Sequence, residues 1–139
     1  MQVQSYLKFE GRCEEALEFY RKALGAEILM ISRFKDIPDP KPPGMVRPET
    51  ENKVLHSSFR VGETILLATD GECSGKPGFQ GISLSITAEN EAAADRVFAA
   101  LSNGGQVLMP IGKTFFSPRF GMLADRFGVP WMVYVQPTA

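Results

Sequence analysis

Apolar and polar residues that alternate with a period of two mark several strands in this chain. The alternation is strict from Gly81 to Thr87, where Ile82, Leu84 and Ile86 alternate with Ser83, Ser85 and Thr87. In residues 119–125, Phe120, Met122 and Ala124 alternate with Arg119, Gly121, Leu123 and Asp125, and the apolar run 131–135 follows a turn at DRFGVP. Successive side chains of a strand point to opposite faces of its sheet, so these segments are predicted to be strands.

Two other segments place apolar residues three and four positions apart, which is the pattern of an amphipathic helix. The first runs from Cys13 to Leu24 and is followed by Gly25, a residue suited to the left-handed conformation that ends many helices. The second runs from a predicted N-cap at Asn90 to about Leu101. Each helix is expected to cover one face of a sheet.

The order strand, helix, three strands occurs twice along the chain. Aligning Arg60 with Arg126 places Gly62 on Gly128 and Ile65 on Trp131, which indicates a duplicated module. The predicted strands cover residues 2–9, 27–34, 54–61 and 64–70 in the first half and 81–87, 106–116, 119–125 and 131–135 in the second. We therefore expect an α+β fold of two βαβββ modules, about 1–72 and about 79–139, whose strands form a curved mixed sheet with the helices on its outer face.

Residues 36–52 interrupt this pattern with five of the ten prolines, Pro38, Pro40, Pro42, Pro43 and Pro48. Proline at this density cannot continue a sheet, so the segment is predicted to be a long loop. Loops of this length in compact domains are either functional or disordered, and both readings stay open.

Composition narrows the function classes. The chain has 139 residues, of which 44% are hydrophobic and 22% charged, with a net charge of −1, as expected of one globular domain spanning residues 1–139. The basic residues are scattered, which argues against a nucleic-acid partner. No apolar run is long enough for a membrane span, and the N-terminus does not resemble a signal peptide. Two cysteines do not make a disulfide framework, so we expect a cytoplasmic protein.

The sheet face away from the helices is predicted to be polar and aromatic. It would carry His56, Ser58 and Arg60 from one predicted strand, and the candidate residues Tyr6, Ser83, Ser85 and Tyr134 from others. Such a face is too polar for a dry core and too aromatic for a purely solvated surface, so it is expected to line a cavity. His56 is the only histidine; it is either an acid/base or hydrogen-bonding group in that cavity or a structural residue.

Other candidates have a simpler structural reading. Asp70 and Asp125 lie beside turns and are predicted to accept hydrogen bonds from turn amides. Cys13 is expected to be a buried thiol, and Trp131 a core residue that faces a helix. Arg33, Arg60 and Arg119 could bind an anion, but a solvated surface role is the default for each.

The repeat resembles the vicinal oxygen chelate superfamily, which includes glyoxalase I, bleomycin-resistance proteins and extradiol dioxygenases. Three segments, YLKFEGRCEEALEFYRKALGAEI, VLHSSFRVGETILLATD and FGMLADRFGVPWMVYV, resemble its PhnB-like branch in particular. That branch usually carries a Phe-Trp pair before FG, where this chain has Phe115-Phe116. Some relatives are labelled demethylubiquinone methyltransferases, but the sequence has neither a glycine-rich nucleotide motif nor an α/β order, so that activity is not expected.

The resemblance also bears on metal binding. The ligand positions of the metal-dependent members fall here on Ser5, Leu66, Gly81 and Met132, none of which suits a divalent ion in that chemistry. We therefore expect a homodimer that binds a small molecule without a metal or other cofactor. The alternative is an isomerase, lyase or transferase-like enzyme with His56 as acid/base, with or without an atypically placed metal. In either case the expected binding residues are Tyr6, Ser58, Ser83, Phe116, Met132 and Tyr134.

Overall fold

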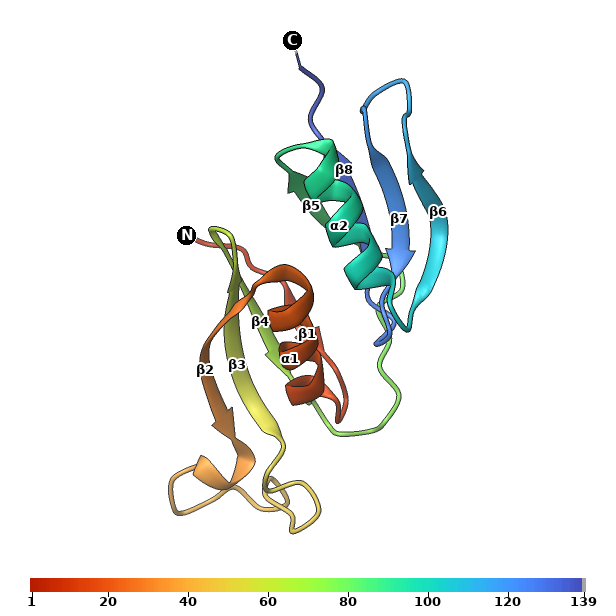
Figure 1. Cartoon of the computed structure of the whole chain (residues 1–139). Helices are drawn as coiled ribbons and strands as arrows, with labels where there is room; N and C mark the ends of the chain where they lie inside the picture. Colours follow the sequence, from red (N-terminus) through yellow and green to blue (C-terminus); the bar gives the residue numbers. More distant parts are fainter. Residues whose placement is uncertain (139) are drawn as a thin grey trace. The chain divides into compact units, whose positions relative to one another are not determined.

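The computed structural model describes residues 1–138, which form two compact units, residues 1–77 and residues from Gly78 on (Figure 1). Each unit contains one helix and four strands in the predicted order. The first consists of β1 (Tyr6–Lys8), α1 (Cys13–Leu24), β2 (Glu27–Arg33), the short 3-10 helix η1 (Phe34–Asp36), β3 (Val54–Val61) and β4 (Thr64–Thr69). The second consists of β5 (Leu84–Ala88), α2 (Glu91–Ser102), β6 (Gln106–Gly112), β7 (Phe120–Ala124) and β8 (Pro130–Val135).

The two modules share one sheet topology. The strand orders are β1-β4-β3-β2 and β5-β8-β7-β6. In each, the first strand pairs parallel with the last and the other neighbours are antiparallel. The α+β class with two βαβββ modules is therefore confirmed, as two four-stranded mixed sheets. The assignment of residues 1–139 to a single domain stays a prediction.

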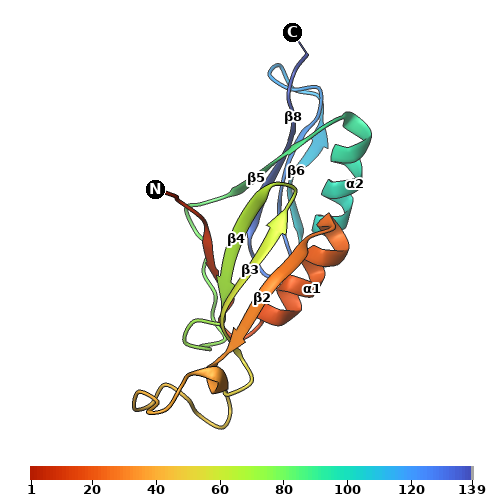
Figure 2. The same cartoon turned by 90° about the vertical axis from the view of Figure 1, so that its left-hand side faces the viewer.

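In the first module, α1 packs on one face of its sheet (Figure 2). Tyr20 of the helix is fully buried and stacks on Phe59 of β3, with ring centroids 5.7 Å apart and an interplanar angle of 13°. The helix begins at Cys13 and ends where Gly25 takes a φ of 67°, both as predicted. In each module, we call the side of the sheet opposite its helix the open face.

In the second module, α2 packs on β7 and β8 and begins as predicted, with the Asn90 side chain accepting a hydrogen bond from the Ala93 N–H at 2.8 Å. Gly121 of β7 faces this helix, because a Cβ atom there would lie 2.6 Å from Cε2 of Phe98. Alternation then places Leu123 on the helix side and Phe120 and Met122 on the open face of this module.

Several predicted bounds are wrong. The strand predicted for residues 2–9 covers only Tyr6–Lys8, and Val3, before it, is 94% exposed. The strand predicted for residues 106–116 ends at Gly112. The repeat alignment is also displaced by one position, since Leu66 and not Ile65 shares the buried, helix-facing side with Trp131. A shift of one residue exchanges the two faces of a strand.

The proline-rich segment is a loop, as predicted, and backbone hydrogen bonds join its two ends. The Phe34 N–H donates to the Lys53 carbonyl at 3.2 Å and the Lys35 N–H to the Glu51 carbonyl at 2.9 Å. Thr50 is 6% exposed. Within residues 1–138, no helix is long and apolar enough to cross a membrane.

Candidate functional site

The open face of the first module brings two predicted site residues together. The Tyr6 hydroxyl lies 2.9 Å from Nδ1 of His56, and the ring centroids are 5.6 Å apart. Tyr6 is 46% exposed and His56 is half-buried. A hydroxyl at Nδ1 restrains the imidazole ring, and Nε2 is the nitrogen that Tyr6 does not engage. Depending on the tautomer, Nε2 is a hydrogen-bond donor or a base.

Ser58 lies on the same face, in a row that crosses the sheet. Leu67 of β4 pairs with both Tyr6 and Ser58, and Met30 of β2 pairs with Ser58. Arg60, two residues further along β3, forms an ion pair with Glu27. The first module therefore offers a hydrogen-bonding surface around the Tyr6–His56 pair.

The open face of the second module is aromatic. Phe116 stacks on Tyr134, with centroids 6.4 Å apart and an interplanar angle of 16°, and meets Phe120 edge to face at 4.9 Å. Phe116 is 39% exposed, whereas Phe120 and Tyr134 are half-buried. The sequence predicts Phe116 on a strand. In the structure it lies in the loop between β6 and β7. The cluster can stack on an aromatic ring.

Hydrogen bonds of the Thr114 and Ser117 side chains fix the turn that carries Phe116. The Thr114 Oγ1 atom accepts from the Phe116 N–H at 3.3 Å and from the Ser117 N–H at 3.1 Å. Ser117 is 3% exposed, and its Oγ lies 2.6 Å from the Val135 carbonyl on β8. The aromatic ring is thus presented by an anchored turn rather than by a free loop.

Beside the aromatic cluster, Met132 lies on the open face, where it pairs with Met122 of β7 and Ser85 of β5. Trp131, the preceding residue, is 3% exposed on the helix side, as predicted. Ser83 is exposed and precedes β5 rather than lying in it, so it is not placed on either face by strand geometry.

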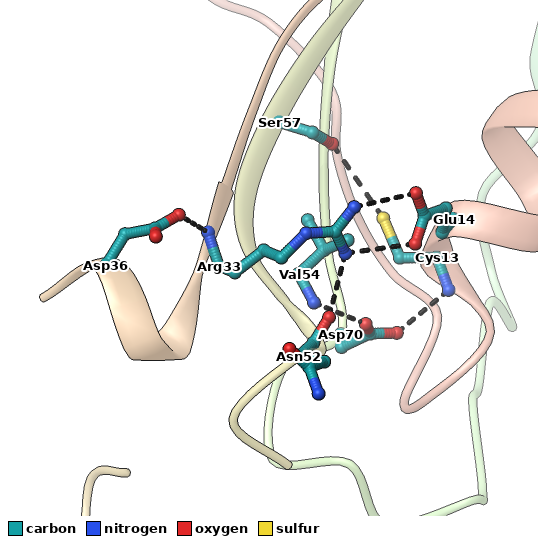
Figure 3. Close-up of polar contacts among 8 residues, drawn as sticks. All are labelled: Cys13, Glu14, Arg33, Asp36, Asn52, Val54, Ser57 and Asp70. Carbon is teal, nitrogen blue, oxygen red and sulfur yellow. Dashed lines mark hydrogen bonds and ion pairs between the residues drawn. The ribbon is translucent and has the colours of Figure 1, made fainter.

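Asp70 and Asp125 bind backbone amides, as predicted. The buried Asp70 carboxylate accepts from the Cys13 N–H at 2.8 Å and the Val54 N–H at 2.7 Å (Figure 3), and also from the Gly11 N–H at 2.9 Å. It thereby joins the start of α1 to β3. Asp125 accepts from the Phe127 and Val129 N–H groups and from Nε1 of Trp131 at 2.8 Å. Both carboxylates have a structural role.

A cavity of about 400 Å³ opens near the start of α1, lined among others by Glu14, Lys53 and Asp70. Arg33, beside the cavity, donates to Glu14 at 2.8 Å and 2.9 Å (Figure 3). Lys53 donates to the Gly11 carbonyl at 2.7 Å. The hydrogen bond from Arg33 lowers the pKa of Glu14 below its usual value. Glu14, Lys53 and Asp70 thus each have a hydrogen-bond partner within the protein.

The thiols are not suited to nucleophilic chemistry. Cys13 is fully buried, as predicted, and desolvation raises its pKa to about 12. Cys73 is half-buried, and desolvation raises its pKa as well. Because the thiolate is the nucleophile, neither side chain is activated.

One of the four positions that were matched to the metal ligands of the superfamily is wrong. Leu66 is 6% exposed on the helix side, so it does not face the open side, and Leu67 does. Within residues 1–138, no three or more His, Cys, Asp or Glu side chains are grouped so that they could hold a metal ion. Metal-independent binding stays a prediction.

Sequence reasoning missed Phe120, Met122 and Met109 as members of the open face. The alternation of residues 119–125 carried the necessary information for the first two. Met109 could not be placed, because β6 contains register shifts on both sides of it.

The whole chain is similar to known proteins. The family model described as 3-demethylubiquinone-9 3-methyltransferase matches residues 1–134. Protein YjdN of Escherichia coli (strain K12) is 32% identical over an alignment of 148 positions, which covers 99% of each chain. Among solved structures, protein PA1353 of Pseudomonas aeruginosa is 37% identical, with a TM-score of 0.84 over 98% of each chain.

Two further structures extend this likeness. A Bacillus cereus protein described as a putative 3-demethylubiquinone-9 3-methyltransferase, PhnB protein, is 33% identical, with a TM-score of 0.78 over 97% of this chain and 99% of that one. A glyoxalase/bleomycin resistance protein/dioxygenase superfamily member from Sphaerobacter thermophilus is 16% identical, with a TM-score of 0.60 over 98% of each chain, which shows the fold alone. The chain therefore belongs to the PhnB-like family described as 3-demethylubiquinone-9 3-methyltransferase and has the glyoxalase/bleomycin-resistance fold.

Proposed function

We propose that this chain binds small aromatic molecules on the open face of its second module. The observation that carries the proposal is the stacking of Phe116 on Tyr134, with Phe120 edge-on to it. An aromatic side chain that is 39% exposed and held by an anchored turn is already placed to stack on a ligand, so little conformational entropy is lost on binding.

The proposal includes binding without a metal and action as a homodimer. Binding without a metal is supported by Ser5, Gly81 and Met132. These residues stand at the metal-ligand positions of the superfamily and are poor ligands for a divalent ion. The apolar residues exposed on the edge strands, such as Leu29 on β2 and Leu108 on β6, support the homodimer, because edge strands usually require protection. Sedimentation equilibrium tests the dimer, and elemental mass spectrometry of protein purified without chelator tests the metal.

The binding test compares Phe116→Ala with the matched control Phe115→Ala. Phe115 is completely exposed, and its ring meets that of Phe116 edge to face. With 2-naphthol as the probe, we expect Phe116→Ala to weaken binding about tenfold, the effect of losing one ring contact and its buried area. We expect Phe115→Ala to change it less than about threefold. Equal losses in both variants, or no binding to the unmodified protein, would reject the proposal.

A second function is favoured by the Tyr6–His56 contact, which restrains an imidazole on the open face of the first module. This arrangement suits an isomerase, lyase or transferase-like enzyme that uses His56 as acid/base, with or without an atypically placed metal. Metal analysis of the native protein and His56→Ala tests the metal-dependent form of this enzyme. A stoichiometric metal that is lost in the variant would favour the enzyme.

We do not expect this chain to have the methyltransferase activity that the family's description names. Neither sheet is the parallel, doubly wound sheet in which nucleotide cofactors bind at a crevice beyond the strand ends. We expect S-adenosylmethionine to give no heat of binding in calorimetry beyond that of a buffer control. Saturable binding of this cofactor would contradict the binding-protein proposal and support the methyltransferase activity.

A further inference from the structure

Three methionines lie in one row across the open face of the second module. Met109 of β6 pairs with Met122 of β7, which pairs with Met132 of β8. Met109 is 44% exposed and the other two are half-buried. The next row along the strands holds Phe120 and Tyr134, which also pair. The methionines thus lie directly beside the aromatic cluster.

The two rows contain no charged side chain. On β5 they continue into the hydroxyl residues Ser85 and Thr87. The nearby Arg119 is directed to the helix side, where its Nε donates to Asp95 at 3.0 Å. A charged ligand on these rows would lose hydration without gaining an opposite charge, which is costly. The chemistry of the face therefore favours an uncharged ligand.

The size of the two rows favours a small molecule over a protein. Three adjacent strands span about 10 Å, and rows two residues apart are about 7 Å from each other. The resulting area of roughly 70 Å² matches two fused aromatic rings, whereas a stable protein interface buries about 800 Å² on each partner. The occupant that fits is an uncharged aromatic molecule of about two rings.

We propose that the row Met109–Met122–Met132 makes this face deformable, so that it accepts uncharged aromatic molecules of unlike shape with similar affinity. The ligand class rests on the proposed function. Methionine is unbranched and has a polarisable sulfur that makes favourable contacts with aromatic rings. Surfaces rich in methionine can re-pack around different partners. Phe116 and Tyr134 supply a fixed wall, and the methionines supply the adjustable one.

Methyl NMR tests this directly. Methyl-¹³C methionine labelling gives one signal for each of the six methionines, and Met1 and Met45, in the first module, serve as references. The probes are flat 2-naphthol, twisted 4-phenylphenol and anionic 2-naphthoate. We expect both neutral probes to shift the signals of Met109, Met122 and Met132, with dissociation constants within about threefold. The anion should bind about tenfold more weakly or less.

Substitution of all three methionines separates flexibility from hydrophobicity. In the triple Met→Ile variant the side chains are branched at Cβ and stiff. We expect it to keep 2-naphthol binding but to lose about tenfold in affinity for 4-phenylphenol. The triple Met→Leu variant, a volume-conserving change, should lose less. Thermal melting checks folding, and if the triple variants melt early, Met109→Ile at the exposed edge replaces them.

The outcomes distinguish this inference from the proposed function. Equal affinities of the Ile and Met proteins for both probes would overturn the inference. So would binding that depends on Phe116 but leaves the three methyl signals unmoved, and in both cases the proposed function would stand. If no neutral probe binds at all, the proposed function fails and the inference fails with it.

Discussion

The Tyr6 hydroxyl and the Nδ1 atom of His56 are 2.9 Å apart although the residues are separated by 50 positions in the chain. Tyr6 is on β1 and His56 is on β3, and β4 lies between these strands. The two side chains therefore meet above β4. The backbones of β1 and β3 are about 10 Å apart. This contact is the clearest polar feature of the open face of the first module.

Tyr6→Phe tests whether the contact orients the histidine. The phenyl ring remains, but the hydroxyl is lost, so the balance between the two His56 tautomers should change. Because His56 is the only histidine, its two ring nitrogens can be assigned in a ¹⁵N spectrum without ambiguity. Stability should fall by no more than about 1 kcal/mol, since the pair is exposed. Tyr134→Phe, in the other module, is the control and should leave the histidine signals unchanged.

Asp70→Asn should destabilise the first module strongly. The carboxylate is 1% exposed and accepts three backbone hydrogen bonds, two from the Gly11 and Cys13 amides and one from the Val54 amide. The amide directs its NH₂ group at N–H donors, so we expect a loss of about 2–4 kcal/mol in unfolding free energy. Urea denaturation measures it. Asp95→Asn, at an exposed ion pair, should cost less than about 1 kcal/mol, and equal losses would show that burial does not matter.

Gly121→Ala tests the packing of α2. The new Cβ would lie 2.6 Å from Cε2 of Phe98 and 2.9 Å from the Cα of Ile111, which is backbone and cannot move alone. Overpacking of this kind costs about 1–3 kcal/mol. Gly112→Ala, where nothing lies within 4 Å of the new atom, should stay within about 0.5 kcal/mol of the native protein. A neutral Gly121→Ala in thermal melting would contradict the packing described.

The buried thiol predicts a pH dependence. The folded pKa of Cys13 is raised to about 12 from 9.0 by desolvation. The stabilising contribution of the neutral thiol is therefore present below pH 9 and is lost as the pH rises from 9 toward 12. Urea unfolding of Cys13→Ala should accordingly depend less on pH above 9 than that of the native protein. A parallel decline in both proteins would show that Cys13 is not the group responsible.

Thiol labelling gives an independent check. At pH 8, Cys73→Ser retains only the buried Cys13 and should react about a hundredfold more slowly with a thiol reagent than Cys13→Ser, because it must open first. Addition of urea should remove most of this difference. Rapid labelling of Cys13 in the folded protein would contradict its complete burial.

The sequence predicts the order of elements because each signal is local. The period of the apolar residues identifies α1, Asn90 marks the start of α2, and Gly25 marks the end of α1. Both helices follow from residues that are close in the chain. The roles of Asp70 and Asp125 follow from turn chemistry in the same way.

The faces of the strands were harder to predict, because a register error of one residue exchanges them. The repeat alignment makes Ile65 equivalent to Trp131, although Leu66 is the residue that, like Trp131, faces the helix of its module. Because β6 contains register shifts on both sides of Met109, its pairing with Met122 could not be predicted from the alternation. The contact of Tyr6 with His56 depends on the order of β1, β4 and β3, which no local pattern contains.

The alternation along β7 and β8 also has an evolutionary consequence. Gly121, Leu123 and Val133 face the helix and hold the module together, whereas their immediate neighbours face outward. Exchanges among the outward residues should alter which molecules bind while leaving the melting temperature nearly unchanged. Duplicated modules of this topology can therefore diverge in ligand preference through few substitutions, without passing through unstable intermediates.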